Sequence, residues 1–315
     1  MSGRPRAAFF SPRAGGISAS MTNLSFSSPR RAAPVLSRLA APRRSLAALG
    51  FLGLAALVPA AAQANPFLGK CLKGEVGSRV LAETCQQALE IGRMSAREEA
   101  GAWTNLGVAL SELGRDGDAI GAFDKAAAAD GSLSAIYVNR ALALSRRGRD
   151  AEALADWGRA ITLEPRSTEP LVGRASLQLQ RGNPSGALAD LDRAVALDPA
   201  DADANYNRGV ALAALNRLDE AARAFGQVLA INPRDAAAHL QRGAALARAG
   251  DLSGGLRDLD AALSLSPDWA AAWATRGQLR ERAGDREAAA QDYRRAFELG
   301  YQAPWLNEKI QSLGG

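Results

Sequence analysis

Residues 100–133 read AGAWTNLGVALSELGRDGDAIGAFDKAAAADGSL, and residues 134–167 read SAIYVNRALALSRRGRDAEALADWGRAITLEPRS. Both stretches span 34 residues, and their pattern of small and bulky residues continues in the same phase to about residue 301. One row of small residues consists of Gly107, Ala141, Ala175, Gly209, Gly243 and Gly277. The same step gives a second small row (Ala119, Ala153, Ala187, Ala221, Gly255, Ala289), a bulky row (Phe123, Trp157, Leu191, Phe225, Leu259, Tyr293) and a third small row (Ala126, Ala160, Ala194, Val228, Ala262, Ala296). A fixed period of this length predicts a stack of like units.

Within each unit the spacing predicts two helices joined by a turn. In the second unit Tyr137, Ala141 and Leu144 recur at intervals of three and four, as on one face of a helix. The expected turn residues are Gly114, Gly148, Gly182, Asn216, Gly250 and Gly284. Gly and Asn adopt the left-handed backbone conformation that ends a helix. Four units end in a proline that suits a turn into the next unit, at Pro165, Pro199, Pro233 and Pro267.

The unit resembles the tetratricopeptide repeat, whose 34 residues carry an aromatic residue, then Leu-Gly, and later Ala, Phe, Ala and Pro. In the first unit the matching residues are Trp103, Leu106, Gly107, Ala119, Phe123 and Ala126. Leu110 replaces the usual Tyr, and Gly131 replaces the usual Pro. The position that usually holds Leu carries Arg140, Arg174, Arg208, Arg242 and Arg276. The resemblance covers about two thirds of the chain and implies an all-α, right-handed superhelical solenoid with six units over residues 100–301.

Residues 1–64 differ from the rest of the chain in charge. They carry eight Arg, no Lys and no acidic residue, which leaves 30 Lys and Arg against 33 Asp and Glu in the remainder. The formal net charge of +5 therefore comes from this leader. A protein that binds nucleic acid needs a clustered basic face, so the body gives no support for nucleic acid as a partner.

The end of this leader has the features of a secretory signal peptide. An apolar run of thirteen residues at 46–58 is followed by Pro59 and by a small-x-small sequence at 62–64. The run is shorter than the roughly 20 apolar residues of a membrane-spanning helix. We expect cleavage after Ala64 and no membrane span in the mature chain. The paired Arg at 43–44 leaves both the general and the twin-Arg export routes open.

More than forty residues precede that apolar run, and they are rich in Ser and Arg. Such a composition resembles an organellar transit peptide. A transit peptide followed by a signal peptide resembles the two-part leader of plastid thylakoid-lumen proteins. The alternative is a bacterial periplasmic protein whose true start lies later, at Met21, and the sequence does not decide between a start at Met1 and one at Met21. The sequence favours the lumen and leaves the periplasm open.

The two ends of the mature chain are predicted to close the stack. Residues 65–99 are expected to form a degenerate opening unit with a helix over 80–91. Cys71 and Cys85 are the two cysteines of the sequence, and exported proteins often fold where paired cysteines form disulfides. Closing a loop of about 15 residues would stabilise this unit by roughly 3 kcal/mol. Residues 302–315 are predicted to form a capping helix with a polar outer face.

The resemblance implies a groove, lined by the first helix of each unit, in which members of the family hold ligands. At the fifth and ninth positions of the units this lining is apolar through its middle. The predicted partner-binding residues are Val138, Leu142, Val172, Tyr206, Val210 and Leu240. Members that clamp a carboxylate carry Lys and Asn at those two positions, and this chain has neither, although Asn105, Asn139 and Asn207 hold the sixth position. The predicted ligand is therefore a peptide with apolar anchors, and the alternative is that these side chains only pack between adjacent helices.

The Arg column allows two interpretations. One is a cationic stripe for an acidic partner, and the other is that each Arg lies along a neighbouring helix and pairs with an acid. Acids recur at Asp156, Asp190, Asp258 and Asp292, which favours internal pairing. Asp156 with Arg159, and Asp190 with Arg193, are predicted to pair on a solvated helix face.

The sequence shows no arrangement of residues typical of an enzyme. His239 is the only histidine and holds the aromatic position of its unit, which predicts a packing role. Phosphate-binding Gly loops, metal-ligand spacings and a Gly-x-Ser-x-Gly elbow are absent from the sequence, so no cofactor or metal is expected. Asp258 and Asp260 lie in helical patterns and are expected to be solvated.

The predicted function is therefore a non-enzymatic scaffold that binds a protein or peptide in an exported compartment. By analogy with the family, helping membrane complexes to assemble would be a natural task there. Two alternatives stay open, namely an enzyme or the accessory subunit of one, and a scaffold that associates with itself. The fold class does not name the partner.

Overall fold

The computed structural model describes residues 65–74 and 77–313 of the 315-residue chain. All regular structure within these residues is α-helical. The helices are α2 (Leu68–Lys73), α3 (Ser78–Ile91), α4 (Ala96–Glu112), α5 (Asp116–Asp130), α6 (Ser134–Arg146), α7 (Asp150–Leu163), α8 (Glu169–Gln180), α9 (Pro184–Leu197), α10 (Ala202–Ala214), α11 (Leu218–Ile231), α12 (Ala236–Ala249), α13 (Leu252–Leu265), α14 (Ala270–Arg282), α15 (Arg286–Glu298) and α16 (Pro304–Leu313). The predicted leader at 1–64, with its cleavage site, lies outside the described residues.

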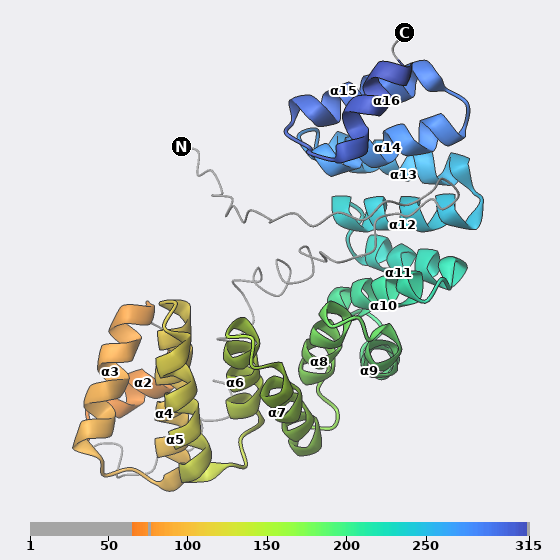
Figure 1. Cartoon of the computed structure of the whole chain (residues 1–315). Coiled ribbons are helices and arrows are strands. Elements are labelled where there is room, and N and C mark those ends of the chain that lie inside the picture. Colours follow the sequence, from red (N-terminus) through yellow and green to blue (C-terminus); the bar gives the residue numbers. More distant parts are fainter. Residues whose placement is uncertain (1–64, 75–76, 314–315) are drawn as a thin grey trace.

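The helices follow one another along an arc, from α2 at one end to α16 at the other (Figure 1). They form sequential antiparallel pairs, and each helix packs against the helix before it and the helix after it. In one pair, Figure 1 shows α8 toward the hollow of the arc and α9 on its outer side. The first helices of neighbouring pairs also contact each other directly. The predicted all-α solenoid of helix-turn-helix units is therefore confirmed.

Each pair from α4 to α15 turns at the residue predicted from the sequence. The φ angles at the turns are 77° at Gly114, 73° at Gly148, 74° at Gly182, 60° at Asn216, 107° at Gly250 and 88° at Gly284. A positive φ brings a Cβ atom too close to the neighbouring carbonyl, and Asn tolerates this better than other residues with a side chain. This steric limit explains why only Gly and Asn occur in the row.

The small residue of the first helix makes room for the bulky residue of the second. A Cβ atom placed on Gly107 would lie 2.5 Å from the ring of Phe123, and one on Gly277 would lie 2.6 Å from the ring of Tyr293. Both rings are fully buried. The two rows found in the sequence are therefore the two sides of one contact, and a larger residue in the small row would push the helices apart.

The loop between units is held by a side chain at position 4 of the next unit, counting Ala100 as position 1. The donors and the carbonyl oxygens that accept are Tyr137 Oη to Gly131 (3.2 Å), Asn205 Nδ2 to Pro199 (3.0 Å) and Trp273 Nε1 to Pro267 (2.9 Å). Each bond spans six residues and joins the start of a helix to the end of the preceding unit. Loops between units are thus fixed by hydrogen bonds as well as by proline.

The opening unit is closed by the predicted disulfide. The Cys71–Cys85 bond joins α2 to α3 with a Cα–Cα distance of 4.9 Å, and both residues are completely buried. The helix expected over 80–91 begins two residues earlier, at Ser78. This covalent link holds the short helix α2, which contacts α3 and α4 in the described part of the chain.

The last helix, α16, lies against α15 with its apolar side. Leu306 is buried there, whereas Asn307 and Gln311 are exposed. Among the helices described, none combines the length and the apolar composition that crossing a bilayer requires. The polar outer side of α16 suits the end of a stack.

Candidate functional site

The six residues predicted to contact a partner lie on the first helices of four neighbouring pairs. Val138 and Leu142 are on α6, Val172 is on α8, Tyr206 and Val210 are on α10, and Leu240 is on α12. Val138, Val172 and Tyr206 are buried, whereas Leu142, Val210 and Leu240 are half-buried. The set therefore divides into core residues and residues that keep accessible apolar surface.

The buried members stabilise the fold. The ring of Tyr206 lies edge-on against Phe225, with centroids 5.5 Å apart and planes at 69°. Val172 belongs to the same apolar cluster, and Val138 belongs to the cluster before it. A ligand on these helices would contact chiefly the three half-buried side chains.

Two of the three Asn residues at position 6 join neighbouring units. The amide nitrogens donate from Asn105 to the Cys71 carbonyl (2.9 Å), from Asn139 to the Ala135 carbonyl (2.8 Å) and from Asn207 to Ser176 Oγ (3.3 Å). The first bond links α4 to α2, and the third links α10 to α8. Asn139 bonds within its own helix. In this protein the Asn side chains at position 6 therefore bind groups within the stack, and their partial match to the carboxylate clamp of other family members is explained by these internal bonds.

The Arg column pairs with acids inside the stack. Four of its members donate to a carboxylate sixteen residues later at N–O distances of 2.7 to 2.9 Å, in the pairs Arg140–Asp156, Arg174–Asp190, Arg242–Asp258 and Arg276–Asp292. All four acids are buried. A carboxylate held by both nitrogens of one guanidinium fork is a strong and directional contact. Internal pairing, the favoured interpretation of the column, is confirmed for these four.

The pairs predicted within single helices are wrong. Asp156 and Asp190 point into their helix pairs and bind the Arg column, so neither lies on a solvated face. The guanidinium of Arg159 lies over the ring of Tyr137, 6.0 Å from its centroid. Spacing along one helix cannot show which side faces the neighbouring helix.

Comparisons with known proteins agree with this geometry. A tetratricopeptide repeat model matches residues 172–237 and 212–268, and a second model of the same repeat matches residues 270–299. The chain therefore contains tetratricopeptide repeats over these residues. No curated protein matches it.

Several solved structures share the fold. YrrB, a TPR protein with an unusual peptide-binding site, is 26% identical with a TM-score of 0.52 over 61% of this chain and 96% of its own. MamA from Desulfovibrio magneticus RS-1 is 25% identical with a TM-score of 0.51 over 53% of this chain and 94% of its own. The pilF protein of Pseudomonas aeruginosa shows the likeness of fold alone, at 17% identity and a TM-score of 0.59 over 70% of this chain and 98% of its own.

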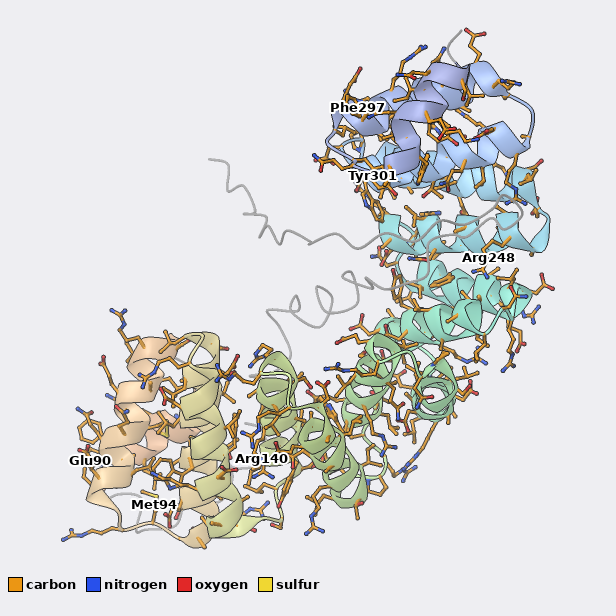
Figure 2. The ribbon with its side chains drawn as sticks, in the orientation of Figure 1. Glu90, Met94, Arg140, Arg248, Phe297 and Tyr301 are labelled. Carbon is orange, nitrogen blue, oxygen red and sulfur yellow. A yellow bond between two sulfur atoms is a disulfide. The ribbon has the colours of Figure 1, made fainter. Side chains whose placement is uncertain are left out.

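Ion pairs made by the Arg column cross alternate joints between the repeat units, where the units are numbered from Ala100. The crossing pairs are Arg140 Nη1 with Asp124 (2.7 Å), Arg208 Nε with Asp192 (2.6 Å) and Arg276 Nη1 with Asp260 (2.7 Å). Arg140 is labelled in Figure 2 and reaches back from α6 to α5. At the two joints between these, the acid is replaced by Gly158 and by Gly226. The cross-joint pairs of the Arg column therefore alternate although the period is constant, and a different ion pair, Arg181 with Asp150, crosses the joint between the second and third units.

These contacts shift several ionisation equilibria in the direction that favours the charged forms. The hydrogen bond to Asp156 raises the pKa of the Arg140 guanidinium, and the hydrogen bond to Asp258 does the same for the pKa of Arg242. Burial alone would raise the pKa of Asp116, but hydrogen bonds from Arg146 and Ser111 bring that pKa below its ordinary value. The ionised side chains therefore hold neighbouring helices together.

His239 has a more specific place than packing alone. Its Nδ1 lies 2.9 Å from Asp258 Oδ1, and its Nε2 lies 3.1 Å from the carbonyl oxygen of Pro233. The expectation that Asp258 is solvated is wrong, because this carboxylate is buried between His239 and Arg242. Over residues 65–74 and 77–313, no three His, Cys, Asp or Glu side chains are placed to hold a metal ion.

Sequence reasoning missed the hydrogen bonds made from position 4, although the residue types carried a signal. The side chains that can donate there are Trp103, Tyr137, Asn205, His239 and Trp273. The remaining unit has Leu171, which has no polar atom in its side chain. In that unit Arg193 Nη2 donates to the Pro165 carbonyl instead. The carbonyl at this loop is thus bonded even where the usual donor is missing.

Proposed function

We propose that the protein is a non-enzymatic scaffold that binds an extended stretch of another protein along α6, α8, α10 and α12. The observation that carries this proposal is that Leu142, Val210 and Leu240 remain partly accessible, one each on α6, α10 and α12. Apolar anchors on three of these four helices suit a peptide that lies across them. YrrB, with its unusual peptide-binding site, gives a precedent among similar folds.

Site-specific photo-crosslinking tests this surface. A photoreactive amino acid placed singly at Leu142, Val210 and Leu240 should capture the same partner from all three positions. The matched controls are Ala155 on α7 and Ala189 on α9, which are exposed on the second helices of their pairs. Capture from the controls as strong as from the three test positions would contradict the assignment.

Substitutions that test partner binding should avoid the three buried members of the six predicted partner-binding residues. Tyr206→Ala would remove a ring packed on Phe225 and would cost roughly 3 kcal/mol or more in stability. Val210→Ser and Leu240→Ser change side chains that are only half-buried, so they should weaken partner capture with little change in the thermal midpoint. Capture that is unchanged in the double variant would remove this surface from consideration.

We also propose that the chain is exported, to the plastid thylakoid lumen or alternatively to a bacterial periplasm, and assists the assembly of membrane complexes there. Two features support export: the signal-like pattern in residues 1–64 and the Cys71–Cys85 disulfide. Disulfides persist in oxidising compartments and are rare in reducing ones.

Fractionation of the source cells, followed by N-terminal sequencing, tests export. The expected mature protein begins at Asn65 and has no reactive thiol until it is reduced. Recovery of the chain from the cytosol, with its leader intact and two free thiols, would contradict the proposal.

A further inference from the structure

One of the four helices assigned to the partner surface has no accessible apolar side chain at the positions that supply the anchors. On α8, position 5 is Val172 and position 9 is Ser176, and both are buried. The hydroxyl of Ser176 also accepts a hydrogen bond from Asn207 Nδ2 at 3.3 Å. Position 2 of the same helix is Glu169, and its side chain is exposed. The surface therefore offers a carboxylate on α8, where α6, α10 and α12 offer apolar side chains.

Position 2 lies on the same side of the helix as positions 5 and 9. Residues three and seven apart in an α-helix project from one face, and Glu169 precedes Val172 by three residues and Ser176 by seven. In the third and fourth units position 2 holds Glu169 and Asp203, and in the other four units it holds a residue without charge: Gly101, Ala135, Ala237 and Ala271. The carboxylates of this row are therefore confined to α8 and α10, in the middle of the partner surface.

Glu169 differs from the acids inside the stack because no cation in the described part of the chain binds it. Asp190, by contrast, accepts two hydrogen bonds from Arg174, at 2.7 and 2.8 Å. Within residues 65–74 and 77–313 the Glu169 carboxylate makes no hydrogen bond and no ion pair. The charged group that acts on it is another carboxylate, Glu164, which is also exposed. A cation brought by a second molecule would meet two negative charges here without first breaking an ion pair of Glu169.

The ionisation of Glu169 agrees with this lack of a cation. Its surface stays accessible to water, but the surrounding stack displaces part of its hydration, and this burial, followed by the charge of Glu164, raises the pKa of Glu169. The other carboxyls of the described residues with a shifted pKa are shifted downward, because each accepts hydrogen bonds from neighbouring groups: Asp116, Asp130, Glu152 and Glu220. A nearby positive charge would favour the ionised form of Glu169.

We propose that the peptide held along α6, α8, α10 and α12 carries a lysine or arginine between its apolar side chains, and that Glu169 binds this cation. The inference rests on the proposed function and specifies its partner. Since α8 lies between α6 and α10 along the arc (Figure 1), the cation falls between the apolar side chain at Leu142 and those at Val210 and Leu240. Neighbouring first helices are in contact. Packed helices lie about 8–10 Å apart, a distance that an extended peptide crosses in about three residues.

Selection from a displayed library of random peptides tests the proposal without a known partner. Peptides of about 12 residues are long enough to span the four helices. On the full wild-type chain we expect enrichment of sequences with a lysine or arginine about three residues from apolar residues on either side. On Glu169→Gln we expect the apolar residues to remain and the basic residue to lose its enrichment.

The matched control for this selection is Asp219→Asn. Asp219 is exposed and lies in the first turn of α11, a second helix, as Glu169 lies in the first turn of α8. Both changes remove one negative charge, but the control should select the same peptides as wild type. A basic residue that stays enriched on Glu169→Gln, or apolar peptides without one on wild type, would overturn the inference and leave the surface standing. Failure to enrich apolar peptides at all would overturn both.

A charge exchange measures the contact itself. For one selected lysine peptide, fluorescence anisotropy should show binding about two- to fivefold weaker to Glu169→Gln than to wild type, as for an accessible ion pair. Replacing the lysine of the peptide by glutamate should weaken binding to wild type and strengthen binding to Glu169→Lys. Equal thermal midpoints show that the variants are folded. The same change in affinity on wild type and on Glu169→Lys would mean that the cation binds elsewhere and would contradict the proposal.

Discussion

The joint between the second and third units and the joint between the fifth and sixth are closed by different chemistry. At the former, the ring of Trp157 crosses into the third unit, where a Cβ atom on Gly173 would lie 2.5 Å from it. At the latter, Arg276 donates to Asp260 in the fifth unit and to Asp292 in its own, at 2.7 Å in each case. The constant period therefore fixes where units meet. An ion pair between Arg181 and Asp150 also crosses the former joint, so the two joints differ in the ring of Trp157 and not in whether a charge crosses them.

The difference also explains a departure from the repeat. The other units carry Asn, Gln or Thr at position 6, and the third unit carries Gly173. Phe123 and Tyr293 pack on glycines of their own units, whereas Trp157 packs on a glycine of the next. The longer indole reaches across the joint, and only a residue without a side chain leaves it room.

The largest effect should come from the charged joint. Arg276→Gln leaves the Asp292 carboxylate, which is 1% exposed, with Arg280 as its remaining cation. Removing one partner from a buried ion pair typically costs 3–5 kcal/mol, and because Arg280 remains we expect a loss of roughly 3 kcal/mol in urea unfolding. Arg208→Gln is the control, because its partner Asp192 is 50% exposed, and it should cost about 1 kcal/mol or less. Equal losses would mean that burial does not distinguish the two contacts.

The aromatic joint should respond to added volume. Gly173→Ala places a methyl group against the Trp157 ring, and overpacking of this kind should cost about 2 kcal/mol. The control in the same joint is Gly158→Ala, whose Cβ atom would meet Arg174 at 3.7 Å, an ordinary contact. That change should be neutral or should stabilise the helix by up to about 1 kcal/mol.

A double variant shows whether the ring causes the loss at Gly173. Combined with Trp157→Phe, which shortens the ring, Gly173→Ala should cost less than it does alone. If the stability losses of Gly173→Ala and Trp157→Phe simply add in the double variant, the loss at Gly173 does not come from contact with the Trp157 ring.

The loop carbonyls offer a smaller comparison. Arg193→Ala removes the donor to the Pro165 carbonyl at the aromatic joint, and a net loss of about 1 kcal/mol is expected for one hydrogen bond. Trp273→Phe removes the corresponding donor to Pro267 at the charged joint. If thermal unfolding showed a loss for Trp273→Phe but none for Arg193→Ala, the guanidinium would not be replacing the donor missing from Leu171.

The smallest change in stability should appear at the joint between the first and second units, and it should be absent at acid pH. Asp116 pairs with Arg146 at 2.7 Å, and its pKa is lowered in the folded chain. A carboxyl with a lowered pKa stabilises the fold above its ordinary range, near pH 4, and this contribution is lost as the pH falls. Asp116→Asn should therefore be less stable than wild type at neutral pH, and the gap should close on acidification. A gap that stayed constant in acid would contradict the pairing.

Much of the fold could be predicted from the sequence because it depends on spacing. The rows of small and bulky residues predicted the stack of like units, in which Gly107 and Phe123 are in contact, and the Gly and Asn row predicted the turns. The disulfide followed from having just Cys71 and Cys85. These features are local in the sequence or strictly periodic, so the spacing of residues along the chain is enough to predict them.

The contacts that the sequence did not predict depend on which side of each helix faces the neighbouring helix. Asp156 is three residues from Arg159 but binds Arg140, sixteen residues away, because the hairpin brings them together. For the same reason Tyr206, predicted to face a ligand, is buried against Phe225. The place of His239 in the repeat predicts packing, but its second contact, with Asp258, comes from another helix.

Hydrogen exchange measured along the chain for Arg276→Gln against wild type tests the central claim most directly. That claim is that each unit is held by its neighbours through contacts particular to each joint, as expected for a linear stack. Amides of α13 to α16 should exchange faster in the variant, while those of α4 to α7 should keep their wild-type rates. Faster exchange spread evenly from α4 to α16 would contradict the account.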